Sequence, residues 1–178
     1  MRRSRPIPAL IPERRLRARV RALGRRIRRD HPGKPLLLIG VLKGAFVFMA
    51  DLARAVGPPL RCGFVGVSSY RDGTAPSGRI RLEYGLSEPV RGRHVVLVED
   101  IVDTGRTASF LLGLLRRRRP ASLRLCALLR KRARMRVPVR VDYLGFDIPD
   151  RFVVGYGLDH AGFYRDLPYV GVWKGAGR

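Results

Sequence analysis

The fold is decided by the stretch His94-Val95-Val96-Leu97-Val98-Glu99-Asp100-Ile101-Val102-Asp103-Thr104-Gly105-Arg106-Thr107. Its short apolar run, residues 95–98, has the length and β-branched composition of a buried strand, and it stops at two adjacent carboxylates. A third acid follows at Asp103, then small residues, then an apolar run at helical spacing over 108–115. We therefore predict a buried strand, an acidic turn, a small-residue loop and the start of a helix.

This order of elements is suited to binding a phosphate and a sugar together. Backbone N–H groups at a helix N-terminus, with nearby threonine hydroxyls, can surround an anion. Glu99 and Asp100 repel each other after a buried strand, which costs stability unless a cation or a sugar hydroxyl uses them. Ordinary turn acids are the alternative interpretation, but the loop that follows supplies the anion site. The sequence contains neither GxxxxGK[ST] nor GxGxxG, so we expect neither a triphosphate P-loop nor a dinucleotide fold.

The bulk composition indicates a soluble globular protein. Its 178 residues, 46% hydrophobic and 29% charged, fit one domain with a sizeable core. No apolar run approaches the roughly 18–20 residues of a membrane span, and prolines interrupt any signal-peptide core after Arg2 and Arg3, so we expect a cytoplasmic protein. Cys62 and Cys126 lie in apolar segments, where we expect buried free thiols, although the sequence leaves a disulfide open.

The net charge of +23 raises the question of nucleic acid. The arginines are scattered, however, and alternate with helix-compatible apolar positions, which favours solvated basic faces. An anionic substrate is a third partner for positive charge. We do not expect nucleic-acid binding to be the main function.

The remaining chain alternates strands, tight turns and helices, which predicts an α/β fold. Apolar residues at 16, 20, 23 and 27 form one stripe of a helix over 13–29. Residues 1–12 are expected to be irregular and basic, and 71–78 an exposed, mobile loop. We predict further helices over 45–56 and 107–119, and strands over 36–42, 61–70, 80–84, 122–129 and 139–146. A short apolar segment follows over 152–156, and 169–173 is expected to form a last edge strand. We see no second domain within 1–178.

Four blocks of the chain resemble a known family, the type I phosphoribosyltransferases. Residues 98–107, Val-Glu-Asp-Ile-Val-Asp-Thr-Gly-Arg-Thr, resemble the phosphoribosyl-pyrophosphate signature of that family. Residues 40–46 resemble the first active-site loop of its hypoxanthine–guanine branch, 67–70 with the following loop resemble the mobile lid, and 145–159 resemble the purine-binding segment. The resemblance implies a Rossmann-like parallel sheet flanked by helices, with a mobile lid loop and a small purine-binding hood.

The resemblance implies a role for each matching residue on the sugar-phosphate side. Glu99 and Asp100 are expected to bind the ribose hydroxyls, directly or through Mg²⁺, and Asp159 to contact a second Mg²⁺. The 5′-phosphate is expected in a cradle formed by Thr104, Gly105, Arg106 and Thr107. The pyrophosphate is expected to be held by Arg165 and by Leu42, Lys43 and Gly44, with a cis peptide bond before Lys43.

On the purine side, the resemblance implies that Asp103 faces N7 and accepts or donates a proton. Lys131 is expected to donate to O6, Phe152 to stack on the base, and the Val153 backbone to read the exocyclic edge. By residue pattern alone, Lys131 is a solvated cation and Phe152 a core residue. The closing lid is expected to bring in Ser69 and Tyr70. His160 stands where the family often has a tyrosine.

The implied activity is purine salvage: transfer of the 5-phosphoribosyl group from its pyrophosphate to N9 of hypoxanthine or guanine, with Mg²⁺ as cofactor. The expected products are IMP or GMP and pyrophosphate. The resemblance also implies a homodimer or homotetramer. The alternative is a phosphoribosyltransferase-like regulator that binds RNA through its arginine-rich surface.

Overall fold

The structure, a computed structural model, describes residues 7–69 and 80–175, and its centre is a six-stranded sheet. The strand order is β4-β3-β2-β5-β6-β7, with neighbours parallel except β4, which runs antiparallel to β3. The strands are β2 (Leu36–Leu42), β3 (Leu60–Ser69), β4 (Ile80–Tyr84), β5 (His94–Val102), β6 (Ser122–Arg130) and β7 (Tyr143–Asp147). The inner strands β2 and β5 are almost wholly buried, as continuous aliphatic runs in a parallel sheet require.

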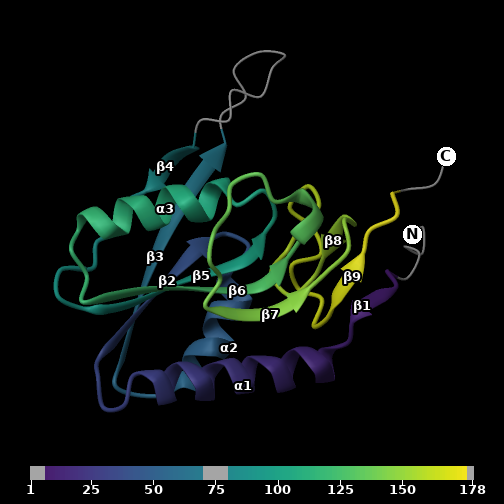
Figure 1. The fold of residues 1–178 in the computed structure, drawn as a ribbon. Coiled ribbons are helices and arrows are strands. Elements are labelled where there is room, and N and C mark those ends of the chain that lie inside the picture. The colour runs from purple at the N-terminus through teal and green to yellow at the C-terminus, as the bar shows by residue number, and fades with distance from the viewer. Residues whose placement is uncertain (1–6, 70–79, 176–178) are drawn as a thin grey trace.

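Helices cover both faces of this sheet, so the predicted α/β class is confirmed (Figure 1). Helices α1 (Glu13–Asp30) and α2 (Phe46–Val56) pack on one face, and α3 (Arg106–Arg117) packs on the other. The predicted stripe of α1 is buried at Leu16, Val20, Leu23 and Ile27. Gly24 lets α1 approach α2 closely, because a Cβ at this position would collide with Ala55.

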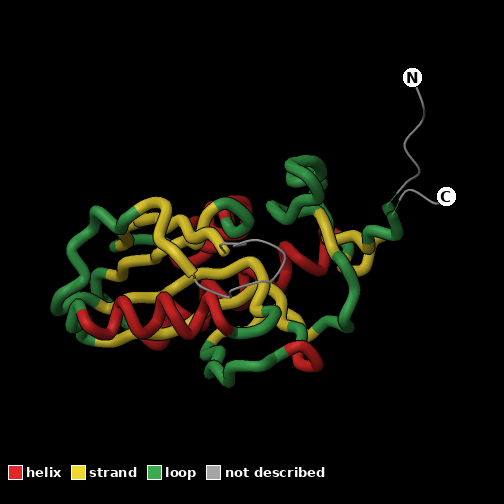
Figure 2. Tube along the Cα trace, turned by 90° about the horizontal axis from the view of Figure 1, so that it is seen from above, coloured by secondary structure: helices red, strands yellow, loops and turns green. Residues whose placement is uncertain are grey.

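A second, three-stranded antiparallel sheet lies to one side of the main sheet (Figure 2). Its order is β1 (Ala9–Ile11), β9 (Val170–Val172), β8 (Val153–Val154). The expected irregular segment 1–12 therefore contains a strand, and 169–173 supplies the central strand rather than an edge. Both differences arise because segments far apart in the chain pair with each other, and strands of two or three residues carry no readable hydrophobic alternation.

Two predicted boundaries were wrong around the sheet. Glu99 and Asp100 lie inside β5 rather than in a turn, because the ladder to β6 continues past them to Ile101↔Leu129 and Val102↔Arg130. The strand expected over 139–146 begins only at Tyr143, since Val139 and Val141 bury their side chains against the α3 side of the core without joining the ladder.

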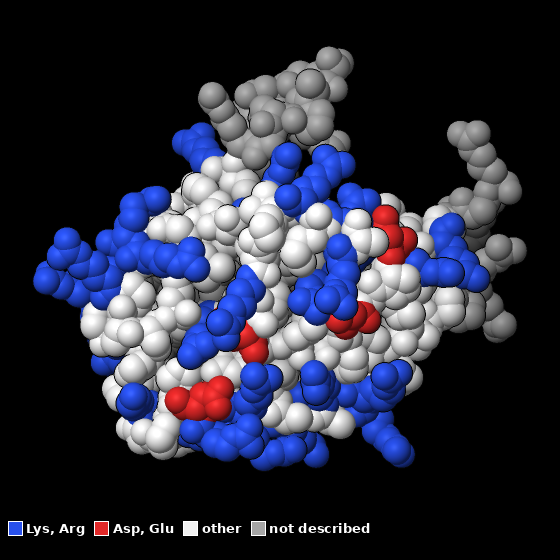
Figure 3. All heavy atoms as spheres, viewed as in Figure 1, with Lys and Arg blue, Asp and Glu red and all other residues white. Residues whose placement is uncertain are grey.

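Both cysteines are free thiols, but only Cys126 is buried, and Cys62 is exposed. No helix in the described parts of the chain is long and apolar enough to cross a membrane. Lysine and arginine side chains are spread over much of the face seen in Figure 3, with few acids among them. This distribution agrees with the predicted scattering of the basic residues.

Candidate active site

A pocket of about 310 Å³ opens at the carboxyl ends of the parallel strands. After β2 the chain adds β3 and β4 on one side of that strand, and it then adds β5, β6 and β7 on the other side. The strand order therefore reverses between β2 and β5, at this edge of the sheet. Open α/β sheets bind ligands at such a point. The pocket is lined by Lys43, Gly44, Asp100, Ile101, Asp103, Lys131, Phe152, Val153, Leu158, Asp159 and Arg165.

Nine of these lining residues were predicted as site residues from the sequence. The structure thus brings together the β2–α2 loop, the end of β5, the start of the loop after β6, and the 152–165 segment. Ile101 and Leu158 were not predicted. Both are apolar residues within matched motifs, and no chemical signal in the sequence distinguishes a pocket wall from core at those positions.

The two carboxylates near the end of β5 differ in exposure: Glu99 is buried, whereas Asp100 is half-buried and lines the pocket. Glu99 is 3% exposed, and its Oε1 has no hydrogen-bond partner among the described residues. Burial, with a smaller effect from the adjacent Asp100 charge, raises the pKa of Glu99 to about 8. Burial also raises the pKa of Asp100 to about 6, against the opposing effects of backbone N–H donors and Arg165. A buried carboxylate with an unpaired oxygen is a costly feature in the absence of a ligand.

The β2–α2 loop lies directly against these acids. The peptide bond between Leu42 and Lys43 is cis, as the resemblance implied. A Cβ on Gly44 would overlap the carboxylate of Asp100, and a Cβ on Gly157 would collide with the Gly44 carbonyl. Glycine is therefore required at both positions for three segments of the chain to meet at the pocket.

The loop 104–107 leads into α3 and leaves its first N–H groups open. Gly105 is the residue before the helix, with φ of 80°, and no side chain caps the helix. Its first turn contains no acid, so the N-terminal dipole is uncompensated by the protein. A Cβ on Gly105 would collide with the Val137 carbonyl, which explains the small residue. This end of α3 has the donors and the field that an anion needs.

The expected purine side of the pocket combines a cation, an acid and an aromatic ring. Lys131 is 7% exposed, and its Nζ lies 3.4 Å from Oδ1 of Asp150. Asp103 Oδ1 accepts a hydrogen bond of 2.7 Å from Arg134 Nε. Neither Asp150 nor Arg134 was predicted as a site residue, because both appear in the sequence as ordinary charged loop residues.

Phe152 is 51% exposed, so its ring is not a core side chain. One neighbour is His160, with the ring centroids 5.6 Å apart in an edge-to-face arrangement. His160 in turn lies 4.8 Å from the Trp173 ring. His160 therefore belongs to an aromatic cluster with Phe152 and Trp173. Another aromatic residue could occupy the same position.

Asp159 and Arg165, which both line the pocket, form an ion pair. Arg165 Nη2 lies 2.7 Å from Asp159 Oδ1, and Arg165 Nη1 donates to the Gly157 carbonyl at 2.6 Å. The second oxygen of Asp159 accepts from the Gly162 backbone N–H at 2.8 Å. Both oxygens of Asp159 are thus engaged by the protein itself.

Some predicted site residues are not among those that line the pocket. Glu99 is buried within β5, Leu42 is the last residue of β2, Thr104 and Gly105 precede α3, and Arg106 and Thr107 begin that helix. Tyr70 lies outside the described residues, and Ser69 ends β3 with an undescribed side chain. Among the described residues, no cluster of three or more acidic, histidine or cysteine side chains is arranged to hold a metal ion.

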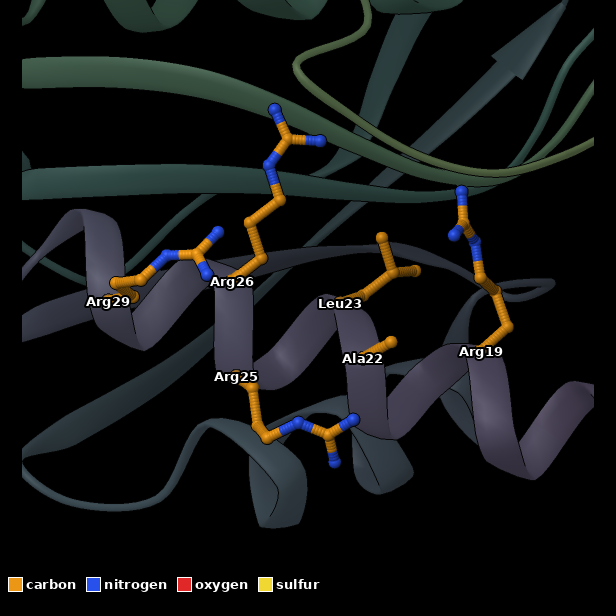
Figure 4. Close-up of a pocket in the computed structure, with 6 residues that line it drawn as sticks. All are labelled: Arg19, Ala22, Leu23, Arg25, Arg26 and Arg29. Atoms are coloured by element: carbon orange, nitrogen blue, oxygen red, sulfur yellow. The ribbon is translucent and has the colours of Figure 1, made fainter.

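A second hollow, of about 290 Å³, lies along α1 and is lined by Arg19, Ala22, Leu23, Arg25, Arg26 and Arg29 (Figure 4). Two of these arginines have contacts within the protein. Arg19 donates to the carbonyls of Leu144 and Gly145, and Arg26 lies over the ring of Tyr143. Arg19 and Arg26 therefore hold α1 against β7.

Comparison with known proteins agrees with this geometry. A family model described as a phosphoribosyl transferase domain matches residues 11–161. The hypoxanthine phosphoribosyltransferase of Salmonella typhimurium is 45% identical over 167 residues, which cover 93% of this chain and 94% of that protein. A crystal structure of a hypoxanthine-guanine phosphoribosyltransferase from Bacillus anthracis superposes with a TM-score of 0.89 at 39% identity, covering 94% of this chain and 99% of that one.

A bifunctional protein TilS/HprT of Listeria monocytogenes is 46% identical over 165 residues. The match covers 93% of this chain but only 26% of that protein, so the chain spans about a quarter of the bifunctional relative.

Proposed function

The chain belongs to the phosphoribosyl transferase family, in its hypoxanthine–guanine branch, and we propose that its pocket transfers a 5-phosphoribosyl group to a 6-oxopurine in purine salvage. The bond from the anomeric carbon of the sugar to pyrophosphate breaks, and a bond from that carbon to N9 of hypoxanthine or guanine forms. The products are IMP or GMP and pyrophosphate. The observation that carries the proposal is the acid pair of β5, the buried Glu99 with an unpartnered oxygen and the pocket-lining Asp100, followed in the chain by the uncapped N-terminus of α3.

The sugar donor is placed by the two ends of this arrangement. Residues 104–107 hold the 5′-phosphate through backbone N–H groups and hydroxyls at the start of α3. Glu99 and Asp100 accept the ribose hydroxyls, which supplies the missing partner of Glu99 Oε1. As the bond to pyrophosphate lengthens, the sugar ring gains positive charge, and carboxylates near the ring stabilise that charge. Lys43 with its neighbours Leu42 and Gly44 faces the leaving group.

The acids fit a Mg²⁺ ion that arrives with the donor. Magnesium is usually bound through one or two carboxylates plus substrate oxygens rather than by an all-protein cage. Asp100 lines the pocket and Glu99 has an unpartnered oxygen, so these two carboxylates would supply the protein ligands in that pattern. The bound ion would supply charge neutralisation at the pyrophosphate and ribose oxygens.

In this proposal the ion pair between Asp159 and Arg165 opens when the donor binds. Arg165 would move from Asp159 to the pyrophosphate, and Asp159 would then have a carboxylate oxygen available to hold a second Mg²⁺. The ion pair of 2.7 Å keeps both charges satisfied before substrate binds. The lid residues Ser69 and Tyr70 close over the donor and exclude the water that would hydrolyse it.

The base is recognised by groups on three segments. Lys131 donates to O6, Phe152 stacks on the ring, and the Val153 backbone reads the exocyclic edge. Asp103 exchanges a proton with N7. A cation at O6 favours 6-oxopurines over adenine, because an amino group there would face a donor and lose its hydrogen bond.

We also propose that residues 1–178 act as one domain in a homo-oligomer. The small sheet shares a hydrophobic core with the main sheet through Ile11, Val153 and Val170. Phe64 and Tyr84, on neighbouring strands, are 43% and 56% exposed. Exposed aromatic residues on neighbouring strands are suited to contact a second copy of the chain. A molar mass of one chain by light scattering at micromolar concentration would overturn this assembly.

A steady-state assay tests the activity. Hypoxanthine, guanine, xanthine and adenine are each supplied with the sugar pyrophosphate and Mg²⁺, and nucleotide and pyrophosphate are measured. We expect equimolar products with hypoxanthine or guanine and at most traces with adenine. Absence of nucleotide with every base would exclude the enzyme. RNA binding with a steep salt dependence, together with such inactivity, would support the regulator, for which the arginine hollow of α1 is the favourable feature.

A further inference from the structure

The end of β6 and the segment after it contain arginines at 130, 132, 134 and 136, and Arg134 contacts the acids of the purine pocket. Arg130 forms a two-bond pair with Asp147 outside the pocket, at 2.7 and 3.0 Å. Arg134 instead contacts Asp103 at 2.7 Å through Nε and lies 3.5 Å from Asp150 Oδ2 through Nη1. Arg132 is exposed, and the acid that its charge influences is Asp147, which does not line the pocket.

Four charges therefore alternate along one line: Asp103, Arg134, Asp150 and Lys131. The last link joins Lys131 Nζ to Asp150 Oδ1 at 3.4 Å. The two ends of the line are the groups proposed to meet N7 and O6 of the purine. The charges of Asp103 and then of Asp150 raise the pKa of Arg134 above its ordinary value.

The backbone around this line is fixed as well. The Lys131 N–H donates to the Val102 carbonyl at 3.0 Å, and the Arg134 N–H donates to the Lys131 carbonyl at 3.2 Å. The N–H groups of Arg136 and Val137 both donate to the Thr104 carbonyl at 3.0 Å. The segments on either side of Asp103 thus hold the backbone of the Arg134 loop in place. The Arg134 guanidinium adds a side-chain contact to the Asp103 carboxylate.

We propose that Arg134 is a positioning residue of the purine site. Its guanidinium holds Oδ1 of Asp103, which leaves Oδ2 directed to the purine, and it holds Asp150, which keeps the Lys131 ammonium at the O6 position. The planar fork of an arginine can contact two carboxylates in fixed directions, whereas a lysine offers a single point of charge. This inference rests on the proposed function and deepens it, because it couples base recognition to proton transfer through one side chain.

Arg134→Met tests the inference, with Arg134→Lys and Arg132→Met as matched variants. For Arg134→Met we expect kcat/KM for hypoxanthine to fall about 10- to 100-fold, through both kcat and the hypoxanthine KM, because misplacement of a reacting group by about 1 Å costs up to about a hundredfold. The KM for the sugar donor should stay within about twofold, and thermal unfolding should be little changed, since the Arg134 side chain is 46% exposed. Arg134→Lys should recover part of kcat but not the hypoxanthine KM. Arg132→Met should behave as the wild type.

The double variant Arg134→Met/Asp150→Asn separates positioning from a general effect of charge. If Arg134 acts through Asp150 on Lys131, the two losses in hypoxanthine KM should overlap rather than multiply. The inference is overturned if Arg134→Met keeps the wild-type kcat/KM, or if Arg132→Met loses as much. It is also overturned if the donor KM rises as much as the purine KM. A wild-type chain that makes no nucleotide would instead overturn the proposed function.

Discussion

Replacing Glu99 by glutamine should change how the stability of the metal-free, ligand-free protein depends on pH. Burial and the neighbouring Asp100 raise the pKa of Glu99 from 4.5 to about 8. The folded protein therefore keeps a proton that the unfolded chain releases between these two values. The stability associated with this proton is fully present below about pH 4.5 and is lost as the pH rises through about 8.

The size of the effect follows from the shift. Each unit of pKa difference is worth about 1.4 kcal/mol, so the wild type loses about 5 kcal/mol from this group between pH 4.5 and pH 8. Asp100, whose pKa is raised to about 6, acts in the same direction at lower pH and is present in both proteins. Glutamine has nearly the same shape but does not titrate, so Glu99→Gln removes only the contribution of Glu99.

Urea unfolding at pH 5, 6, 7 and 8.5 with a chelator present measures the difference. We expect the stability of Glu99→Gln relative to wild type to rise by about 1 kcal/mol per pH unit across this range. The matched control is Glu13→Gln, whose exposed carboxylate pairs with Arg17 along α1 and should matter by less than about 0.5 kcal/mol. Parallel stability curves for Glu99→Gln and wild type would refute the reasoning that this carboxylate is buried without a partner.

Three further substitutions test separate parts of the structure. Lys131→Ala should raise the KM for hypoxanthine at least about tenfold, because a buried purine O6 without a hydrogen-bond donor costs about 1–3 kcal/mol. The donor KM should be nearly unchanged. In steady-state kinetics, an equal loss for every base would indicate a structural role instead. Gly105→Ala should weaken binding of the sugar donor, because the positive φ costs an alanine about 1 kcal/mol and the added Cβ would collide with the Val137 carbonyl. Titration calorimetry with the donor measures the affinity, and an unchanged affinity would contradict this expectation. Tyr156→Phe removes a 2.7 Å hydrogen bond to Asp51 at a 4% exposed residue and should cost about 1.5 kcal/mol in urea unfolding, whereas no loss would show that the bond contributes nothing.

The main sheet and its helices were predictable because their signals are local. The aliphatic run over 36–42 and the stripe of Leu16, Val20, Leu23 and Ile27 carry the strand and helix periods directly. The sheet formed by β1, β9 and β8 was not predictable in this way. Its strands have two or three residues each, and the pairing of β1 with β9 joins positions more than 150 residues apart. The exposure of Cys62 likewise depends on how the helices cover β3, which the strand's own sequence does not contain.

The residues of the candidate site were likewise predictable only where their signal is local. The acids of β5 and the small loop before α3 were indicated by chemistry, since like charges after an apolar run and an open helix start both need a ligand. Lys131 and Phe152 were indicated only by resemblance to the family, because alone they resemble a surface cation and a core ring. Arg134 and Asp150 carried no signal. Their relation to Asp103 and Lys131 comes from the approach of two loops, which only the folded chain displays.

The central claim is that the purine pocket at the ends of β5 and β6 performs the transfer, with Asp103 meeting the base. The most direct measurement is kcat for Asp103→Asn against wild type, with hypoxanthine and the sugar donor both saturating and Mg²⁺ present. We expect kcat to fall about 10²- to 10⁴-fold, as the loss of a general acid–base group does, with the donor KM within about twofold of wild type. A kcat equal to that of the wild type would contradict the account.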